Sequence, residues 1–152
     1  MDISAKTDYA VRALLAMAAA GDDRPVSVEE LSTRQELPRT FLEAIVAELR
    51  RAGLVTSRRG PSGGYALARP ASQISLGDVF RAVDGPLAEV HGLRPHETAY
   101  DGAAEHLPVV WVAVRASLRR VLDETSLADV LSGALPAHVR DLAAGPDAWQ
   151  NR

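Results

Sequence analysis

The sequence predicts a mostly α-helical fold with a small two-stranded wing (α+β): a winged helix-turn-helix extended by a long C-terminal helix. Three observations predict it. Apolar residues recur at helical spacing in three segments before residue 53, a glycine-rich turn at 60–64 joins two short apolar segments, and a long apolar helix begins at Pro108. Helix, short helix, helix and hairpin, in this order, are typical of a winged helix-turn-helix. A small α+β domain with the same elements in another arrangement is the alternative.

The first two helices have clear start and stop signals. In residues 7–20 the apolar side chains recur at spacings of three and four, and a polar Gly-Asp-Asp-Arg-Pro segment ends the helix. Ser27 and Glu30 then have the spacing of a capping box, in which each side chain accepts a hydrogen bond from a backbone N–H at the helix start. The second helix is short because Pro38 disfavours helical geometry in the residue before it.

A third helix and a hairpin follow. Pro38 suits the first turn of this helix, where its missing N–H is not needed, and Gly53 suits the C-terminal stop. The apolar stripe of the helix consists of Leu42, Ile45, Val46 and Leu49. We expect strands at 54–59 and 65–69, because the three glycines between them allow only a tight turn.

The rest of the chain changes in character after Pro86. We expect a winged DNA-binding domain at 1–86, closed by a capped helix at 75–83, then an effector or sensor loop at 87–107, a dimerisation helix region at 108–132 and a C-terminal tail at 133–152. Residues 87–107 lack strong periodicity, and a segment this long without clear structure is functional or mobile.

The helix that begins at Pro108 is apolar on every side in its first turns, and such a helix must be covered on every side. One small domain does not offer enough surface for that, so we expect a second copy of the chain to cover the remainder. The predicted dimer contacts are Val110, Trp111, Val114, Leu118 and Val121.

Composition excludes several classes of function. The chain of 152 residues has no cysteine, which excludes disulfides, thiolate zinc sites and cysteine-held iron–sulphur clusters. The N-terminus lacks a signal-peptide pattern and the longest apolar run, 109–114, is far shorter than a membrane span. We therefore expect a cytoplasmic protein without a membrane partner. No nucleophile elbow, phosphate loop or dinucleotide fingerprint is present, so we do not expect an enzyme.

The net charge of −3 divides unevenly along the chain. Residues 1–70 hold 10 Lys and Arg against 9 Asp and Glu, whereas residues 71–152 hold 7 against 11. The window 50–69 contains five arginines and no acid. Because a local positive field attracts a polyanion whatever the total charge, this window favours binding to nucleic acid.

The third helix offers the side chains that major-groove recognition requires. Arg39 and Thr40 at its exposed start reach phosphates or base edges, and Phe41 suits contact with a thymine methyl group. Arg50 and Arg51 lie at the far end, where we expect them near the DNA backbone.

The hairpin offers a second set of contacts. Arg58 and Arg59 precede its turn, where an arginine suits a narrow minor groove, and Gly63 allows close approach to phosphates. A charged strand edge that discourages pairing with other strands is the alternative for the two arginines.

Four motifs resemble the Rrf2 family of bacterial transcription factors. They lie at 7–14 (TDYAVRAL), 47–55 (AELRRAGLV), 59–69 (RGPSGGYALAR) and 74–85 (ISLGDVFRAVDG). The match is closest over residues 1–86 and looser through the long helix. The resemblance implies a homodimer with crossed long helices that binds a palindromic operator in double-stranded DNA, usually as a repressor. It also implies that Arg39, Thr40 and Phe41 face the major groove, and that Arg58, Arg59 and Ser62 face the minor groove or backbone.

The chain departs from this family in residues 87–107. Sensing members hold an iron–sulphur cluster there through three cysteines, so we expect this chain to respond to a different effector. His91, His96 and His106 lie in this segment among four acids, and such side chains suit zinc, iron or nickel, although their spacing matches no compact metal motif. A solvated polar loop and a pocket for a small organic effector beside Trp111 are the alternatives.

A further alternative is a winged domain that binds protein rather than DNA. Salt distinguishes the two, because DNA affinity falls steeply as salt rises.

Overall fold

The N-terminal part of the chain consists of helices and a hairpin around one apolar core, and the predicted fold class is confirmed. The computed structural model describes residues 1–151. Its first elements are α1 (Ala5–Ala20), α2 (Val28–Gln35), α3 (Arg39–Arg51), β1 (Val55–Arg58), β2 (Gly64–Leu67), η1 (Ala71–Gln73) and α4 (Leu76–Val83). The later elements are η2 (Pro95–Glu97), η3 (Gly102–Ala104), α5 (Leu107–Leu122), α6 (Leu127–Ser132) and α7 (Ala137–Ala143).

The helix starts differ from the sequence prediction in two details. The Ser27 hydroxyl accepts from the backbone N–H of Glu30 at 3.0 Å, as a cap does. The Glu30 carboxylate instead pairs with Arg24 and Arg34, so the predicted capping box is only half formed. Pro38 is the N-cap residue of α3 rather than its first helical residue. Both helices still begin where the local signals place them.

The hairpin is attached to the helices by a third extended segment. β1 and β2 pair antiparallel, with Val55 opposite Leu67, and each strand is shorter than predicted. Val26, in the α1–α2 connection, exchanges two backbone hydrogen bonds of 2.8 Å with Tyr65. A Cβ at Gly64 would lie 2.6 Å from the carbonyl oxygen of Val26, so only glycine permits this approach. The base of the wing is therefore fixed to the helical core.

The core of the winged domain includes a residue from beyond the long helix. Leu127 of α6 is fully buried, and its backbone N–H donates to the carbonyl of Ile74 at 2.9 Å. In return, the N–H of Leu76 donates to Thr125 at 2.9 Å. The chain thus leaves the winged domain along 87–107, returns along α5, and packs α6 against α1.

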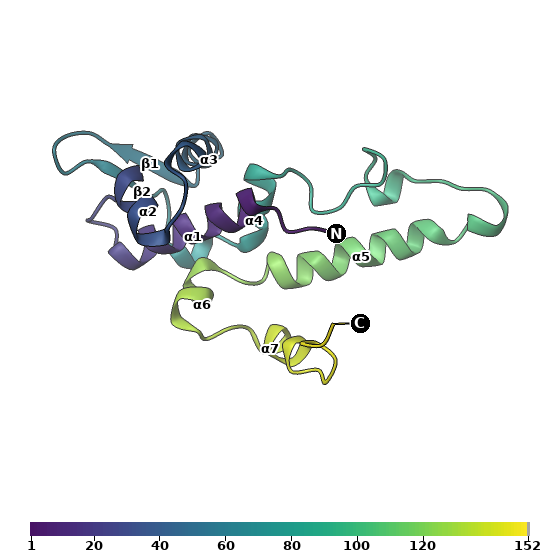
Figure 1. The fold of residues 1–152 in the computed structure, drawn as a ribbon. Helices are drawn as coiled ribbons and strands as arrows, with labels where there is room; N and C mark the ends of the chain where they lie inside the picture. Colours follow the sequence, from purple (N-terminus) through teal and green to yellow (C-terminus); the bar gives the residue numbers. More distant parts are fainter. Residues whose placement is uncertain (152) are drawn as a thin grey trace.

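Helix α5 projects away from this domain, and residues 87–107 run beside it toward its start (Figure 1). No residue of α5 is fully buried in the described chain. Helix α7 lies within the segment 133–152, where the sequence analysis expected no helix. Among the described residues, none of the helices combines the length and the apolar character needed to cross a membrane.

Candidate nucleic-acid interface

The start of α3 is presented to solvent because the other face of the helix fills the core. Leu42, Ile45, Val46 and Leu49 are all buried, which leaves Arg39, Thr40 and Phe41 exposed, as predicted. The Phe41 side chain is 57% exposed, and its ring lies edge-on to Tyr9 with 6.4 Å between the ring centroids. The Phe41 ring is therefore accessible to a ligand at the start of α3.

The exposed face of α3 includes residues that were not predicted from the sequence as DNA contacts. Glu43 accepts a hydrogen bond from Nε of Arg39 at 3.3 Å, and both side chains are more than half exposed. Such an exposed pair contributes little to stability, so the guanidinium is free to exchange it for a phosphate. Ala44 and Ala47 lie on the same exposed face. Their small side chains allow the wall of a DNA groove to approach the helix closely. Both alanines lie between the positions of the apolar stripe, and this placement is the sequence signal that could have identified them.

Arg50 and Arg51 are exposed in the last turn of α3. Within residues 1–151 neither side chain has a hydrogen bond or ion pair. Their positive charges also lie at the negative end of the helix dipole, which they stabilise. This interaction explains the presence of two arginines here without any contact with DNA.

The two wing arginines differ in their surroundings. Nη2 of Arg58 donates to the backbone carbonyl of Asp22 at 2.9 Å, which ties β1 to the α1–α2 connection. Arg59 is exposed and makes no hydrogen bond or ion pair in the described part of the chain. Ser62 is exposed at the turn, and a Cβ at Gly63 would overlap the carbonyl of Arg58. Of the two arginines, Arg59 is therefore the one available to a ligand.

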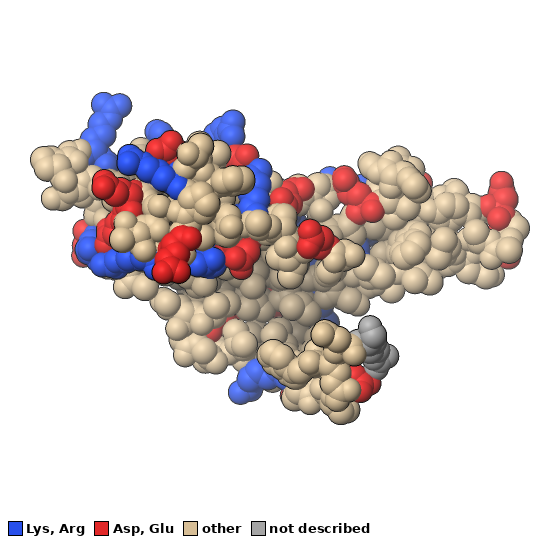
Figure 2. Space-filling view, in the orientation of Figure 1, with Lys and Arg blue, Asp and Glu red and all other residues tan. Residues whose placement is uncertain are grey.

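The wing and α3 form one edge of the molecule, and Figure 2 shows Lys and Arg side chains projecting from that edge. Acidic side chains lie between them lower on the same face. The basic window seen in the sequence is thus gathered on the exposed recognition elements.

The structure does not bring the three loop histidines together. Nδ1 of His96 lies 2.8 Å from Nη1 of Arg115, which can only donate, so this nitrogen is an acceptor. His106 lies at the start of α5 beside Glu105, and His91 is exposed in a left-handed backbone conformation. Over residues 1–151 no group of three or more His, Cys, Asp or Glu side chains is placed to hold a metal ion. The chain also has no cysteine, so its side chains do not fit a cysteine-held iron–sulphur cluster.

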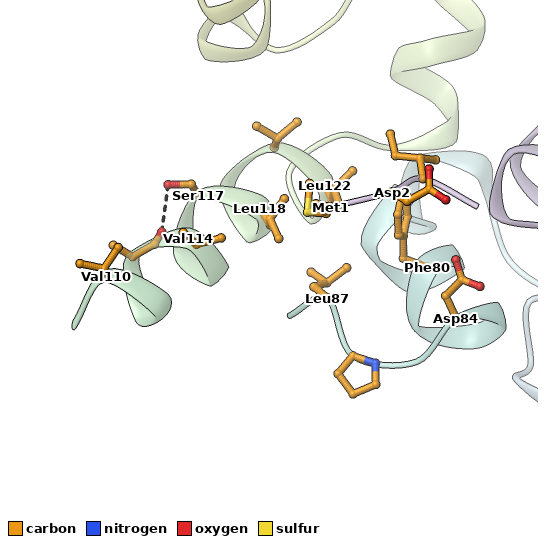
Figure 3. Close-up of a pocket in the computed structure, with 14 residues that line it drawn as sticks. Met1, Asp2, Phe80, Asp84, Leu87, Val110, Val114, Ser117, Leu118 and Leu122 are labelled. Carbon is orange, nitrogen blue, oxygen red and sulfur yellow. Dashed lines mark hydrogen bonds between the residues drawn. The ribbon is translucent and has the colours of Figure 1, made fainter. Parts of the chain in front are cut away.

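An apolar groove of about 650 Å³ lies between α5, the end of α4 and the N-terminus (Figure 3). Four of the predicted dimer residues line it: Val110, Val114, Leu118 and Val121. Trp111 lines a neighbouring cavity of about 490 Å³ beside residues 87–91, which shares Val114 and Leu118 with the groove. Its indole N–H is buried and has no hydrogen-bond partner in the described structure.

A carboxylate at the end of this groove joins the end of α4 to the start of α1. The hydroxyls of Ser4 and Thr7 both donate to Oδ2 of Asp84, the first at 2.6 Å. Partial burial alone would raise the pKa of Asp84, but these hydrogen bonds and the charge of Lys6 outweigh it, and the pKa lies below its ordinary value. Lys6 also bonds the carbonyl of Val83 at 3.0 Å and the carboxylate of Glu48 at 2.9 Å.

Known proteins share this arrangement. A family model described as Rrf2, iron-dependent transcriptional regulator, matches residues 3–133. A helix-turn-helix-type transcriptional regulator of Mycobacterium tuberculosis strain H37Rv is 48% identical over 143 residues, which cover 94% of this chain and 89% of the relative. The regulator CymR of Bacillus subtilis strain 168 is 33% identical over 132 residues, covering 87% and 91%.

Solved structures agree with the sequence comparisons. The structure of B. subtilis CymR, described as the global cysteine regulator of that organism, superposes with a TM-score of 0.75 at 32% identity and covers 88% of this chain and 98% of CymR. The IscR structure from T. potens gives a TM-score of 0.70 at 36% identity, with 88% of each chain covered.

Proposed function

This chain belongs to the Rrf2 family of transcriptional regulators, and from that premise we propose that it binds a palindromic operator as a homodimer and represses transcription. Its place of action would be the cytoplasm, where bacterial DNA lies. The relatives named above are transcriptional regulators rather than enzymes.

The observation that carries the proposal is the exposed start of α3 beside a wing whose Arg59 has no partner in residues 1–151. Arg39 and Thr40 supply donors for phosphates and base edges, and Phe41 an apolar surface for a thymine methyl. A helix start in the major groove with a wing over the adjacent backbone is the docking geometry of such domains.

The homodimer is supported by the groove along α5. Val110 and Val114 are exposed on a face of α5 that the described chain leaves partly uncovered, and contact of such an apolar surface with water is unfavourable. A second α5 crossing here would bury both copies of the groove. Two α3 helices would then read two half-sites, and a palindrome is the DNA sequence with that symmetry.

The effector in this proposal is not an iron–sulphur cluster, because the chain has no cysteine to hold one. Residues 87–107 connect the winged domain to α5. An effector bound to this segment would therefore lie between the DNA contacts and the dimer contacts.

The test is selection of bound duplexes from a random DNA pool, followed by affinity measurements on the selected sequence at several salt concentrations. We expect a palindromic consensus, and an affinity that falls linearly with salt on logarithmic axes. Thr40→Ala should relax the base preference at one position of each half-site, whereas Thr56→Ala on the exposed side of β1 is the matched control. Absence of a consensus, together with weak binding at every salt concentration, would favour a protein-binding winged domain instead.

A further inference from the structure

Four arginines from three parts of the chain line one small cavity beside α5. Arg81 belongs to α4 and Arg94 precedes η2, whereas Arg115 and Arg119 lie one turn apart on α5. The rest of the lining is Gly85, Pro86, Leu87 and Ala88, and the volume is about 220 Å³. Among the described residues no Asp or Glu lines this cavity, which we call the arginine pocket.

Chance does not readily produce this arrangement in this half of the chain. Residues 71–152 hold 7 Lys and Arg against 11 Asp and Glu, yet four of those seven cations converge on one cavity. Like charges held together repel one another, and the repulsion grows as water is excluded. A cluster of this kind is stable where an anion compensates it.

The partners inside the chain compensate only part of the charge. Arg81 pairs with Asp123 at 2.7 Å, and Arg115 donates to Nδ1 of His96, which supplies no negative charge. Over residues 1–151 the guanidinium groups of Arg94 and Arg119 have no hydrogen bond or ion pair. Glu97, the acid nearest in sequence to Arg94, accepts instead from the backbone N–H of that residue at 2.8 Å.

We propose that the arginine pocket binds a small, multiply charged anion through carboxylate or phosphate oxygens. The planar guanidinium group offers paired N–H donors that match the two oxygens of a carboxylate or phosphate. The cavity is smaller than the 300 Å³ or so at which pockets for drug-sized ligands begin, so the ligand is a compact metabolite-like anion or an inorganic one.

The position of the pocket gives the anion a means of regulation, a consequence that rests on the proposed DNA-binding function. One bound anion would join α4 of the winged domain to residues 87–107 and to α5. It would therefore favour whichever arrangement of winged domain and α5 brings all four arginines together, and so shift the DNA affinity of the dimer.

The experiment is calorimetric titration of the DNA-free, full-length chain in chloride buffer. The probes are citrate and succinate in one arm, and inorganic phosphate and diphosphate in the other. We expect saturable binding of at least one anion, and the arm that binds identifies the ligand chemistry. Arg94→Gln and Arg119→Gln should each weaken that binding at least tenfold. Arg120→Gln removes the same charge from α5 outside the pocket and should leave the affinity unchanged.

Two results would overturn the proposal. They are the absence of binding by every probe, and equal losses of anion affinity in Arg119→Gln and Arg120→Gln. Because the titration contains no DNA, failure of the anion proposal leaves the DNA-binding proposal to be judged on its own experiment.

Discussion

Asp123, the residue that follows α5, lies over the backbone of Gly77 in α4. A Cβ at Gly77 would overlap Oδ1 of Asp123 and lie 3.0 Å from both the carboxylate carbon and Nη1 of Arg81. Since only a hydrogen occupies that position, Asp123 can reach Arg81 at 2.7 Å, and this hydrogen bond raises the pKa of Arg81. The absence of a side chain at one position thus lets the winged domain and the long helix meet through an ion pair.

Gly77→Ala should abolish that ion pair by forcing the Asp123 side chain away. The gain in helix propensity, about 1 kcal/mol, is similar to the loss of a half-exposed pair, so stability should change by less than about 1 kcal/mol. The informative measurement is a double-mutant cycle by urea unfolding. Asp123→Ala should be destabilising in the natural sequence and neutral beside Gly77→Ala; equal costs in both backgrounds would show that the two residues are independent.

Leu127→Ala should destabilise the winged domain even though Leu127 lies outside residues 1–86. The side chain is fully buried, and removing a buried leucine side chain costs about 2–5 kcal/mol. Leu131→Ala is the matched control, because Leu131 is on the same helix and 48% exposed. Urea unfolding monitored by circular dichroism compares the two variants, and similar small losses would mean that α6 is not part of this core.

Arg59→Ala should weaken operator binding while leaving the free energy of unfolding within about 0.5 kcal/mol of the natural protein. Removing one phosphate contact should lower the slope of log affinity against log salt by about 1. Arg140→Ala on α7 removes the same charge away from the wing and should leave the slope unchanged. Arg58→Ala should differ from both by also losing stability, since Arg58 bonds to Asp22. An unchanged slope in Arg59→Ala would argue against the wing contact.

Asp84→Asn should destabilise the protein in a pH-dependent way. The folded-state pKa of Asp84 is lowered, so its stabilising effect is complete above the unfolded pKa of about 3.9 and is lost as the pH falls through the folded pKa. Near neutral pH we expect a cost of about 1 kcal/mol, since the site is largely exposed. Urea unfolding from about pH 6 to about pH 3 should show this difference shrinking toward acid. Asp8→Asn, at a looser surface pair with Arg12, is the control.

Val114→Glu should convert the proposed dimer into a monomer. Val114 lines the α5 groove, and burying a carboxylate there costs several kcal/mol. Ala116→Glu places the same charge at an exposed position of α5 outside the groove and should remain dimeric. Sedimentation velocity separates the two outcomes. A monomeric natural protein, or equal dissociation of both variants, would contradict the dimer assignment.

The order of the elements from α1 to α5 and the ends of most of these helices were predictable from sequence because their signals are local. Ser27, Ser75 and Ser126 each cap the helix that follows, and Gly53 takes the left-handed conformation just after α3. The exposure of Arg39, Thr40 and Phe41 followed from the apolar stripe on the other face of the same helix. Such features depend on neighbours within one or two turns.

What depends on distant contacts was not predictable. The burial of Leu127 results from a return of the chain after α5, and periodicity within residues 126–131 does not reveal it. The separation of the loop histidines depends on the contact that His96 makes with Arg115. The arginine pocket depends on how residues 87–107 lie along α5. For Trp111 the sequence left two roles open, a dimer contact and a wall of a loop pocket, and the position of residues 87–91 beside its ring was needed to place it.

The return of α6 to the core has a consequence for biosynthesis. Because a chain emerges from the ribosome N-terminus first, the DNA-reading elements are made long before Leu127, which completes their core. Until then Ile74 and its neighbours lack the leucine that covers them, and we expect the domain to be less stable. A translation product that stopped within α5 would carry the whole recognition helix and wing without a complete core. We therefore expect chains that end prematurely within α5 to be less stable than the complete regulator and to compete poorly with it for DNA.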